Sequence, residues 1–133
     1  MKKAALIVLC FVFLLSATSC APYVSSFKAL GLVRNEWGDH GSAKFQRLDG
    51  TLVLKLRMSG KGEEGAIQCT ASLDEGKINV YYDSLGVKEF LFNLKAGESI
   101  NERRGYVESG HNVYIIIETV EPAKGSVEIN LGK

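Results

Sequence analysis

From residue 43 onward, apolar and polar residues alternate along the chain with a period of two. The clearest example is residues 51–58, where every second side chain is apolar and the side chains between them are mostly charged. The same alternation recurs in residues 66–73, 77–82, 87–94 and 126–131. A period of two is typical of β-strands that bury one face. The alternation therefore predicts an all-β domain, and it also predicts which side of each strand faces the core.

The predicted core consists of the apolar positions on the inward side of each segment. Residues 113–120 differ from the other segments because Ile115, Ile116 and Ile117 are consecutive, which is typical of a central strand covered on both faces. The other inward positions are Leu52, Leu54, Leu56, Met58, Ile67, Cys69, Ala71, Leu73, Ile78, Val80, Tyr82, Phe90, Phe92, Leu94, Val127, Ile129 and Leu131.

Turn residues separate the segments at short intervals. Asp74-Glu75-Gly76 lies between residues 66–73 and 77–82, and it predicts a hairpin with glycine at a position that needs positive φ. Further turns are predicted at residues 83–86, 95–98, 109–112 and 121–125. Regularly spaced strands without a convincing helix favour an antiparallel β-sandwich, jelly-roll-like, of about seven or eight short strands.

Residues 20–42 have no clean period. Phe27, Leu30, Val33 and Trp37 would share one face of a short helix, but Gly31 interrupts it and lowers its stability. A strand or an irregular cover over the core fits this segment equally well. We therefore divide the chain into residues 1–19, a tether and irregular N-terminal segment over residues 20–42, and a sandwich domain over residues 43–133.

The first residues have the layout of a secretory signal. Lys2 and Lys3 precede 12 apolar residues, 4–15, and small residues follow as far as Ser19. A helix that crosses a bilayer needs roughly 20 apolar residues, so a permanent transmembrane anchor is the poorer interpretation. Residues 16–20 resemble the lipobox of bacterial lipoproteins, which implies cleavage between Ser19 and Cys20 and acylation of Cys20. An ordinary signal peptidase site after Ser19 or Ala21 is the alternative.

The three cysteines fit this interpretation. Cys10 would leave with the signal and Cys20 would carry lipid, so Cys69 would be the single thiol of the mature protein. A lone cysteine forms no intramolecular disulfide. An unacylated Cys20 would allow a bridge to Cys69, but the inward position of Cys69 favours a small buried apolar group.

Charge and motifs exclude several function classes. Without Lys2 and Lys3, 14 of the 16 basic residues remain against 15 acidic ones, so the domain lacks the basic character that nucleic-acid binding needs. His40 and His111 are predicted in loops with no nucleophile motif beside them, and two histidines with one inward cysteine are too few for a zinc site. We therefore predict no catalytic residue, no metal site and no cofactor.

Two aromatic residues are the candidates for ligand contact. Trp37 is predicted to lie in a polar loop, residues 35–40, and Tyr81 is predicted to face away from the inward set that includes Tyr82. Exported sandwich domains often bind sugars through exposed aromatic rings. The alternative is that Trp37 caps the end of the core and that Tyr81 is an ordinary exposed strand residue, since large aromatic side chains usually bury most of their area.

The mature chain resembles a group of small uncharacterised bacterial lipoproteins and secreted β-sandwich domains over residues 44–131. The resemblance is carried by residues 44–58, 75–94 and 112–131, and its closing hairpin is matched by Tyr114–Glu118 and Lys124–Ser126. It implies a sandwich fold and an envelope location. The chain is more distantly similar to sandwich domains appended to secreted peptidases. Those domains often carry aspartates where this sequence has Lys77 and Asn79, so a calcium site does not carry over.

These observations lead to one main function hypothesis and two alternatives. The main hypothesis is a lipid-anchored binding or interaction module without catalytic activity, in the cell envelope outside the cytoplasmic membrane. Its expected partners are the membrane, through the lipid on Cys20, and a protein or glycan, but not nucleic acid. A carbohydrate-binding or hydrolase-accessory domain and a structural envelope component are the alternatives.

Overall fold

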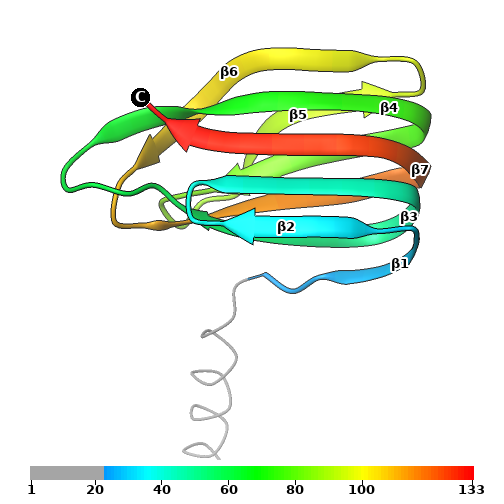
Figure 1. The fold of residues 1–133 in the computed structure, drawn as a ribbon, viewed down its shortest axis with the longest axis horizontal. Coiled ribbons are helices and arrows are strands. Elements are labelled where there is room, and N and C mark those ends of the chain that lie inside the picture. Colours follow the sequence, from blue (N-terminus) through cyan, green and yellow to red (C-terminus); the bar gives the residue numbers. More distant parts are fainter. Residues whose placement is uncertain (1–22) are drawn as a thin grey trace, which may run out of the picture.

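Three strands are much longer than the others and determine the architecture. The structure, a computed structural model, describes residues 23–133 as an all-β domain (Figure 1). The predicted signal peptide, the cleavage site after Ser19 and the lipid attachment at Cys20 lie outside the described residues. Residues 23–133 contain no helix that could span a membrane. The strands are β1 (Ser26–Leu30), β2 (Val33–Trp37), β3 (His40–Arg57), β4 (Glu64–Asp83), β5 (Glu89–Lys95), β6 (Ser99–Glu108) and β7 (Asn112–Gly132).

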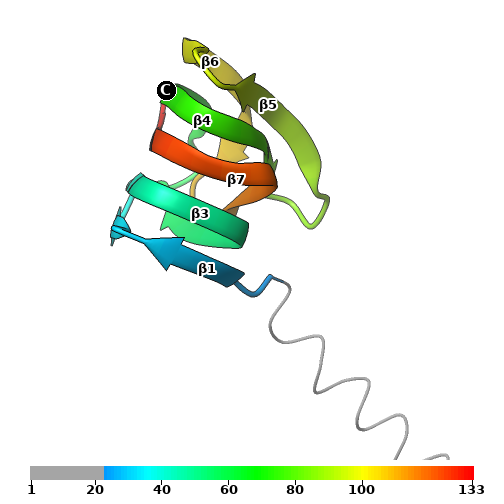
Figure 2. The same ribbon diagram turned by 90° about the vertical axis from the view of Figure 1, so that its right-hand side faces the viewer.

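The strands β3, β4 and β7 each fold over and contribute to both layers of a sandwich. The first half of β3 pairs with the second half of β7, from His40 opposite Asn130 to Phe45 opposite Gly125, and the remaining halves pair from Thr51 opposite Glu118 onward. The strand β4 pairs with β7 along the edge opposite β3, and it bends together with β7 from one layer to the other. Figure 2, which looks at the bent edge, shows the three strands curving side by side. The predicted antiparallel β-sandwich is confirmed, although its central strands are long.

We call the two layers A and B. Layer A contains β2, residues 40–48 of β3, residues 123–132 of β7, residues 64–73 of β4, and β6. Layer B contains residues 51–57 of β3, residues 112–121 of β7, residues 77–83 of β4, and β5. The strand β1 pairs with residues 47–51, where β3 bends from one layer to the other.

Two of the predicted turns are bends inside strands. Residues 74–76 and 121–125 were predicted to reverse the chain, but β4 and β7 run through them with only shifts in register. Gly76 has the expected positive φ of 84°, and a β-carbon there would lie 2.2 Å from the carbonyl oxygen of Pro122. Glycine serves here to let two bending strands approach. The closing hairpin implied by the resemblance is therefore one strand, because Tyr114–Glu118 and Lys124–Ser126 both belong to β7.

The core lies between the layers and matches the alternation closely. All the predicted inward residues except Phe90 are buried, and Cys69 is completely shielded from solvent. Burial raises the pKa of the Cys69 thiol to about 11, which keeps it protonated at neutral pH. Ile116 is also buried although it points out of layer B, so the segment predicted to be covered on both faces is covered so at Ile115–Ile117, whereas Val120 is 54% exposed.

The strand β5 corrects one predicted position. Phe90 is 56% exposed, whereas Leu91 is buried. The register between β4 and β5 shifts at this point, because Val80 lies opposite Phe92 and the next residue, Tyr81, lies opposite Phe90. The shift is a β-bulge, in which Leu91 is the extra residue. It reverses the side of the sheet to which the preceding residues of β5 point. A pattern of alternating residues contains no signal for such an insertion.

The segment predicted as tether and irregular chain, residues 20–42, contains two strands, β1 and β2, and the start of β3. The strand β2 also protects the open edge of β3 in layer B. Arg34 Nη2 donates a hydrogen bond of 2.9 Å to the Val53 carbonyl oxygen, and the Lys55 amide donates one of 2.9 Å to Glu36 Oε2. Side chains that occupy an open edge prevent further strands from pairing there.

Residues 23–25 form a strap across layer B. Tyr23 packs on Tyr114, with ring centroids 5.3 Å apart, and its hydroxyl donates a hydrogen bond of 2.6 Å to Oδ2 of the buried Asp83. Further along, the Val53 amide donates to Ser25 Oγ at 2.9 Å. The strap fixes the chain to the sheet from Tyr23 onward.

We expect Tyr23→Phe to lower the free energy of unfolding by about 1.5–3 kcal/mol, because Asp83 would lose a hydrogen bond to a charged group. Desolvation and the bond to Asp83 raise the pKa of Tyr23 to about 12. The bond therefore stabilises the fold fully below about pH 10, where tyrosine is neutral in the unfolded chain, and the contribution is lost as the pH rises through 12. Urea unfolding across this pH range measures both effects. Tyr81→Phe is the control, and an equal loss in the two variants would contradict the assignment.

Candidate binding face

The outer face of layer A carries mostly polar side chains, many of them short, in three rows that cross all five of its strands. Each row follows from the pairing of β2, β3, β7, β4 and β6. The first row is Val33, Lys44, Ser126, Ser72 and Ser99. The second row is Asn35, Ser42, Glu128, Thr70 and Asn101. The third row is Trp37, His40, Asn130, Gln68 and Arg103.

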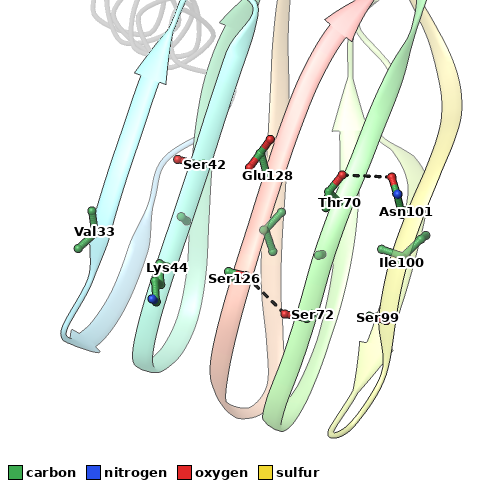
Figure 3. Close-up of a pocket in the computed structure, with 13 residues that line it drawn as sticks. Val33, Ser42, Lys44, Thr70, Ser72, Ser99, Ile100, Asn101, Ser126 and Glu128 are labelled. Atoms are coloured by element: carbon green, nitrogen blue, oxygen red, sulfur yellow. Dashed lines mark hydrogen bonds between the residues drawn. The ribbon is translucent and has the colours of Figure 1, made fainter.

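All residues of the first two rows except Asn35 line a shallow hollow of about 500 Å³ that is open to solvent. Figure 3 shows Ser42 on β3, Ser126 on the next strand β7, Thr70 on β4 and Asn101 on β6. The hydroxyl and amide groups donate and accept hydrogen bonds without carrying charge. Because the hollow is open and lies across several strands, its shape suits an extended ligand better than a small enclosed one.

Hydrogen bonds within the rows hold these side chains in defined positions. Gln68 Nε2 donates to Asn101 Oδ1 at 2.7 Å, and Thr70 Oγ1 donates to the same oxygen at 3.4 Å. Asn130 of the third row donates from Nδ2 to Glu128 Oε1 of the second row at 3.3 Å, and Asn130 Oδ1 lies 2.6 Å from Nδ1 of His40 in its own row. Since that oxygen only accepts, Nδ1 of His40 is the donor in this contact.

Trp37 stands at one corner of this face. It is the last residue of β2 and is 83% exposed, so it does not cap the core. The strand β2 places the side chain at one end of the third row, opposite His40. A ring with this exposure is available to stack on a ligand that lies in the rows.

Tyr81 lies on the other side of the molecule. It points outward as predicted, but from layer B, where its ring contacts Phe90 at 6.0 Å between centroids and Lys88 Nζ lies 4.4 Å from the ring centre. The structure therefore does not bring Trp37 and Tyr81 together on one concave face. Their predicted contact with a ligand stays a prediction, and only Trp37 adjoins the polar rows.

The groups considered for catalysis are dispersed. His40 is held by Asn130, and His111 is an exposed residue with Nε2 3.7 Å from Glu108 Oε2. Cys69 lies in the core. Among residues 23–133, no three histidine, cysteine or acidic side chains are grouped closely enough to hold a metal ion.

The polar rows are the part of the site that sequence reasoning missed. Their members are the outward residues of strands whose inward residues were predicted correctly, for example Gln68, Thr70 and Ser72 between Ile67 and Leu73. The sequence shows that these residues face out, but not which strands are neighbours. Only the strand order places them beside Asn101 and Ser126.

Comparisons with known proteins give only loose likenesses. No family model matches the chain, and no curated protein matches it. One similar solved structure is a variant of a family 29 carbohydrate-binding module, with 15% identity, a TM-score of 0.40 and coverage of 80% of this chain and 73% of that chain. Another variant, complexed with mannohexaose, has 16% identity, a TM-score of 0.39 and coverage of 80% and 78%. The Drosophila melanogaster CENP-C cupin domain has 11% identity, a TM-score of 0.28 and coverage of 79% and 75%. These values identify neither a family nor a ligand for this chain.

Proposed function

We propose that the protein is a lipid-anchored binding module of the cell envelope, without catalytic activity, whose polar rows on layer A bind a neutral glycan chain. The observation that carries the proposal is the outer face of layer A, where hydroxyl and amide side chains from the four strands β3, β7, β4 and β6 line an open hollow. Trp37 stands exposed at the corner of this face.

The chemistry of the rows favours a glycan over other polymers. Sugar hydroxyls donate and accept hydrogen bonds, and serine, threonine, asparagine and glutamine side chains do the same. Sugar rings also present flat C–H faces that pack on an exposed indole. Only a few charged residues lie in the rows, Lys44, Glu128 and Arg103, and they include both signs. This mixture gives no advantage to a strongly charged polymer.

We expect a neutral glycan to change the fluorescence of Trp37, which is the single tryptophan of the chain. A titration would use hexasaccharides of glucose, mannose and N-acetylglucosamine, with calorimetry as the second measurement. Trp37→Ala and the pair Thr70→Ala with Asn101→Ala should each weaken binding by about tenfold or more, which corresponds to about 1.4 kcal/mol.

Matched controls lie on the opposite layer. Asn93→Ala and Phe90→Ala remove an amide and an exposed ring from layer B, and they should leave the affinity unchanged. Higher salt should also change the affinity little, because the expected contacts are uncharged. Failure of all three sugars to bind, or equal losses in the layer B variants, would overturn the glycan proposal and favour a structural envelope component.

The lipid anchor has its own test. We expect labelled palmitate to be incorporated into the full-length protein in bacterial cells and to be absent from Cys20→Ala. The reason is that the sulfur of Cys20 is the proposed acceptor, and the buried thiol of Cys69 is shielded. Equal labelling of the two proteins would contradict the anchor.

A further inference from the structure

Four exposed apolar residues are neighbours in the chain of groups that contact the outward side of layer B, or contact it themselves. Val24, Leu85, Val87 and Phe90 are each more than half exposed. Val24 follows Tyr23, whose hydroxyl is bonded to Asp83, and Leu85 and Val87 belong to the loop that leaves Asp83. Phe90 packs against Tyr81, two residues before Asp83. In Figure 2, the loop between β4 and β5 lies on the same side of the molecule as the start of the described chain. We call these four residues the strap patch.

The distance along the chain from Cys20 to this patch is short. Only Ala21 and Pro22 separate Cys20 from Tyr23, which the bond to Asp83 fixes to layer B. Consecutive Cα atoms are 3.8 Å apart, so the Cα of Tyr23 lies within about 11 Å of the Cα of Cys20. An acylated Cys20 at a bilayer surface would therefore hold the strap patch at that surface.

The charges of layer B also suit a membrane. Glu118, Glu121 and the buried Asp83 are the acidic side chains that point outward from its paired strands, and Glu118 is paired with Lys88 at 2.8 Å. Basic side chains on the same side outnumber them: Lys55, Arg57, Lys77, Lys88 and Lys95. Basic residues beside exposed apolar ones are typical of surfaces that bind anionic lipids.

We propose that layer B is a membrane-docking surface, in which the strap patch enters the headgroup region of an anionic phospholipid bilayer. The inference rests on the lipid anchor of the proposed function, and it extends that function by fixing an orientation. Layer A is the opposite layer of the sandwich, so the polar rows would point away from the bilayer toward ligands in the surrounding space.

The test uses the mature chain from Cys20 onward, which includes every described residue. A maleimide phospholipid attached to Cys20 anchors it to vesicles of phosphatidylethanolamine and phosphatidylglycerol, and Cys69 is shielded from the reagent. Brominated acyl chains quench tryptophans that approach them. In the variant Trp37→Phe with Phe90→Trp, we expect quenching of about twofold or more, because a docked apolar face lies about 5–10 Å into the headgroup and acyl boundary.

The unsubstituted chain is the matched comparison, since its single tryptophan, Trp37, should show almost no quenching. Adding Leu85→Ser and Val87→Asp to the variant that carries Trp37→Phe and Phe90→Trp should abolish most of the quenching of its tryptophan. Thermal melting would verify that this variant is folded. Equal quenching of the two tryptophans, or none at position 90, would overturn the docked orientation.

Because lipid is attached chemically here, this failure is distinct from a failure of palmitate labelling in cells, which would overturn the anchor and with it the premise of docking. It is also distinct from a failure to bind glycans.

Discussion

Gly76→Ala is expected to destabilise the protein by about 4 kcal/mol or more, which is a large part of the 5–15 kcal/mol that holds a typical domain folded. Gly76 lies where β4 bends from layer A to layer B, with a φ of 84°. A β-carbon there would lie 2.2 Å from the Pro122 carbonyl oxygen and 2.8 Å from the Ala123 Cα, and both atoms belong to the backbone of β7. Backbone atoms inside a bent strand cannot move aside as a flexible side chain does, so the bend itself would have to open.

Gly97→Ala is the matched control. Its φ of 86° is nearly the same as that of Gly76, but it lies in the turn between β5 and β6, and a β-carbon there would meet nothing within 4 Å. This variant should lose only the about 1–2 kcal/mol that a left-handed backbone costs a residue with a side chain. Urea unfolding followed by circular dichroism measures both losses. Equal losses would mean that the contact between β4 and β7 at the bend contributes little.

Phe92→Ala is expected to cost about 3–5 kcal/mol, because it removes a large ring from the core and leaves a cavity. Phe92 is 1% exposed and lies in β5 opposite Val80, with its ring between the layers. The same unfolding measurement gives the loss in stability.

Phe90→Ala provides the comparison within the same strand. Phe90 points out of layer B and makes an edge contact with Tyr81, so its removal should cost about 0.5–1.5 kcal/mol. The simple alternation predicts equal losses for the two phenylalanines, whereas the bulge at Leu91 predicts unequal ones. Equal losses would place Phe90 in the core and contradict the bulge.

The alternation predicted the fold class and most of the core because inward and outward sides follow directly from a period of two. It did not distinguish a bend from a turn. Gly76 and Gly125 are positions where two strands pass so closely that a β-carbon would lie 2.2 Å from a backbone oxygen, and in a sequence they look like the ends of hairpins. The difference depends on what lies beside the strand, which is not local information.

The candidate site was less predictable for the same reason. Tyr81 was predicted to face outward from a strand and Trp37 to lie in a polar loop, but Trp37 is the last residue of β2, and the two side chains belong to opposite layers. The polar rows depend on neighbours far apart in the chain, such as Thr70 beside Glu128 and Asn101. Strap residue Tyr23 was assigned to a tether because its partner, Asp83, is 60 residues away. The lipid anchor at Cys20 rests on the sequence alone and stays a prediction.

The continuity of β3, β4 and β7 through both layers has a mechanical consequence. In a sandwich of two separate sheets, a pull on one sheet reaches the other mainly through packed side chains, which resist sliding only weakly because apolar contacts are not directional. Here the same three backbones run from layer A into layer B. Tension on a ligand held by layer A would therefore pass along covalent chain to layer B, and the two layers cannot slide apart unless the bends unfold.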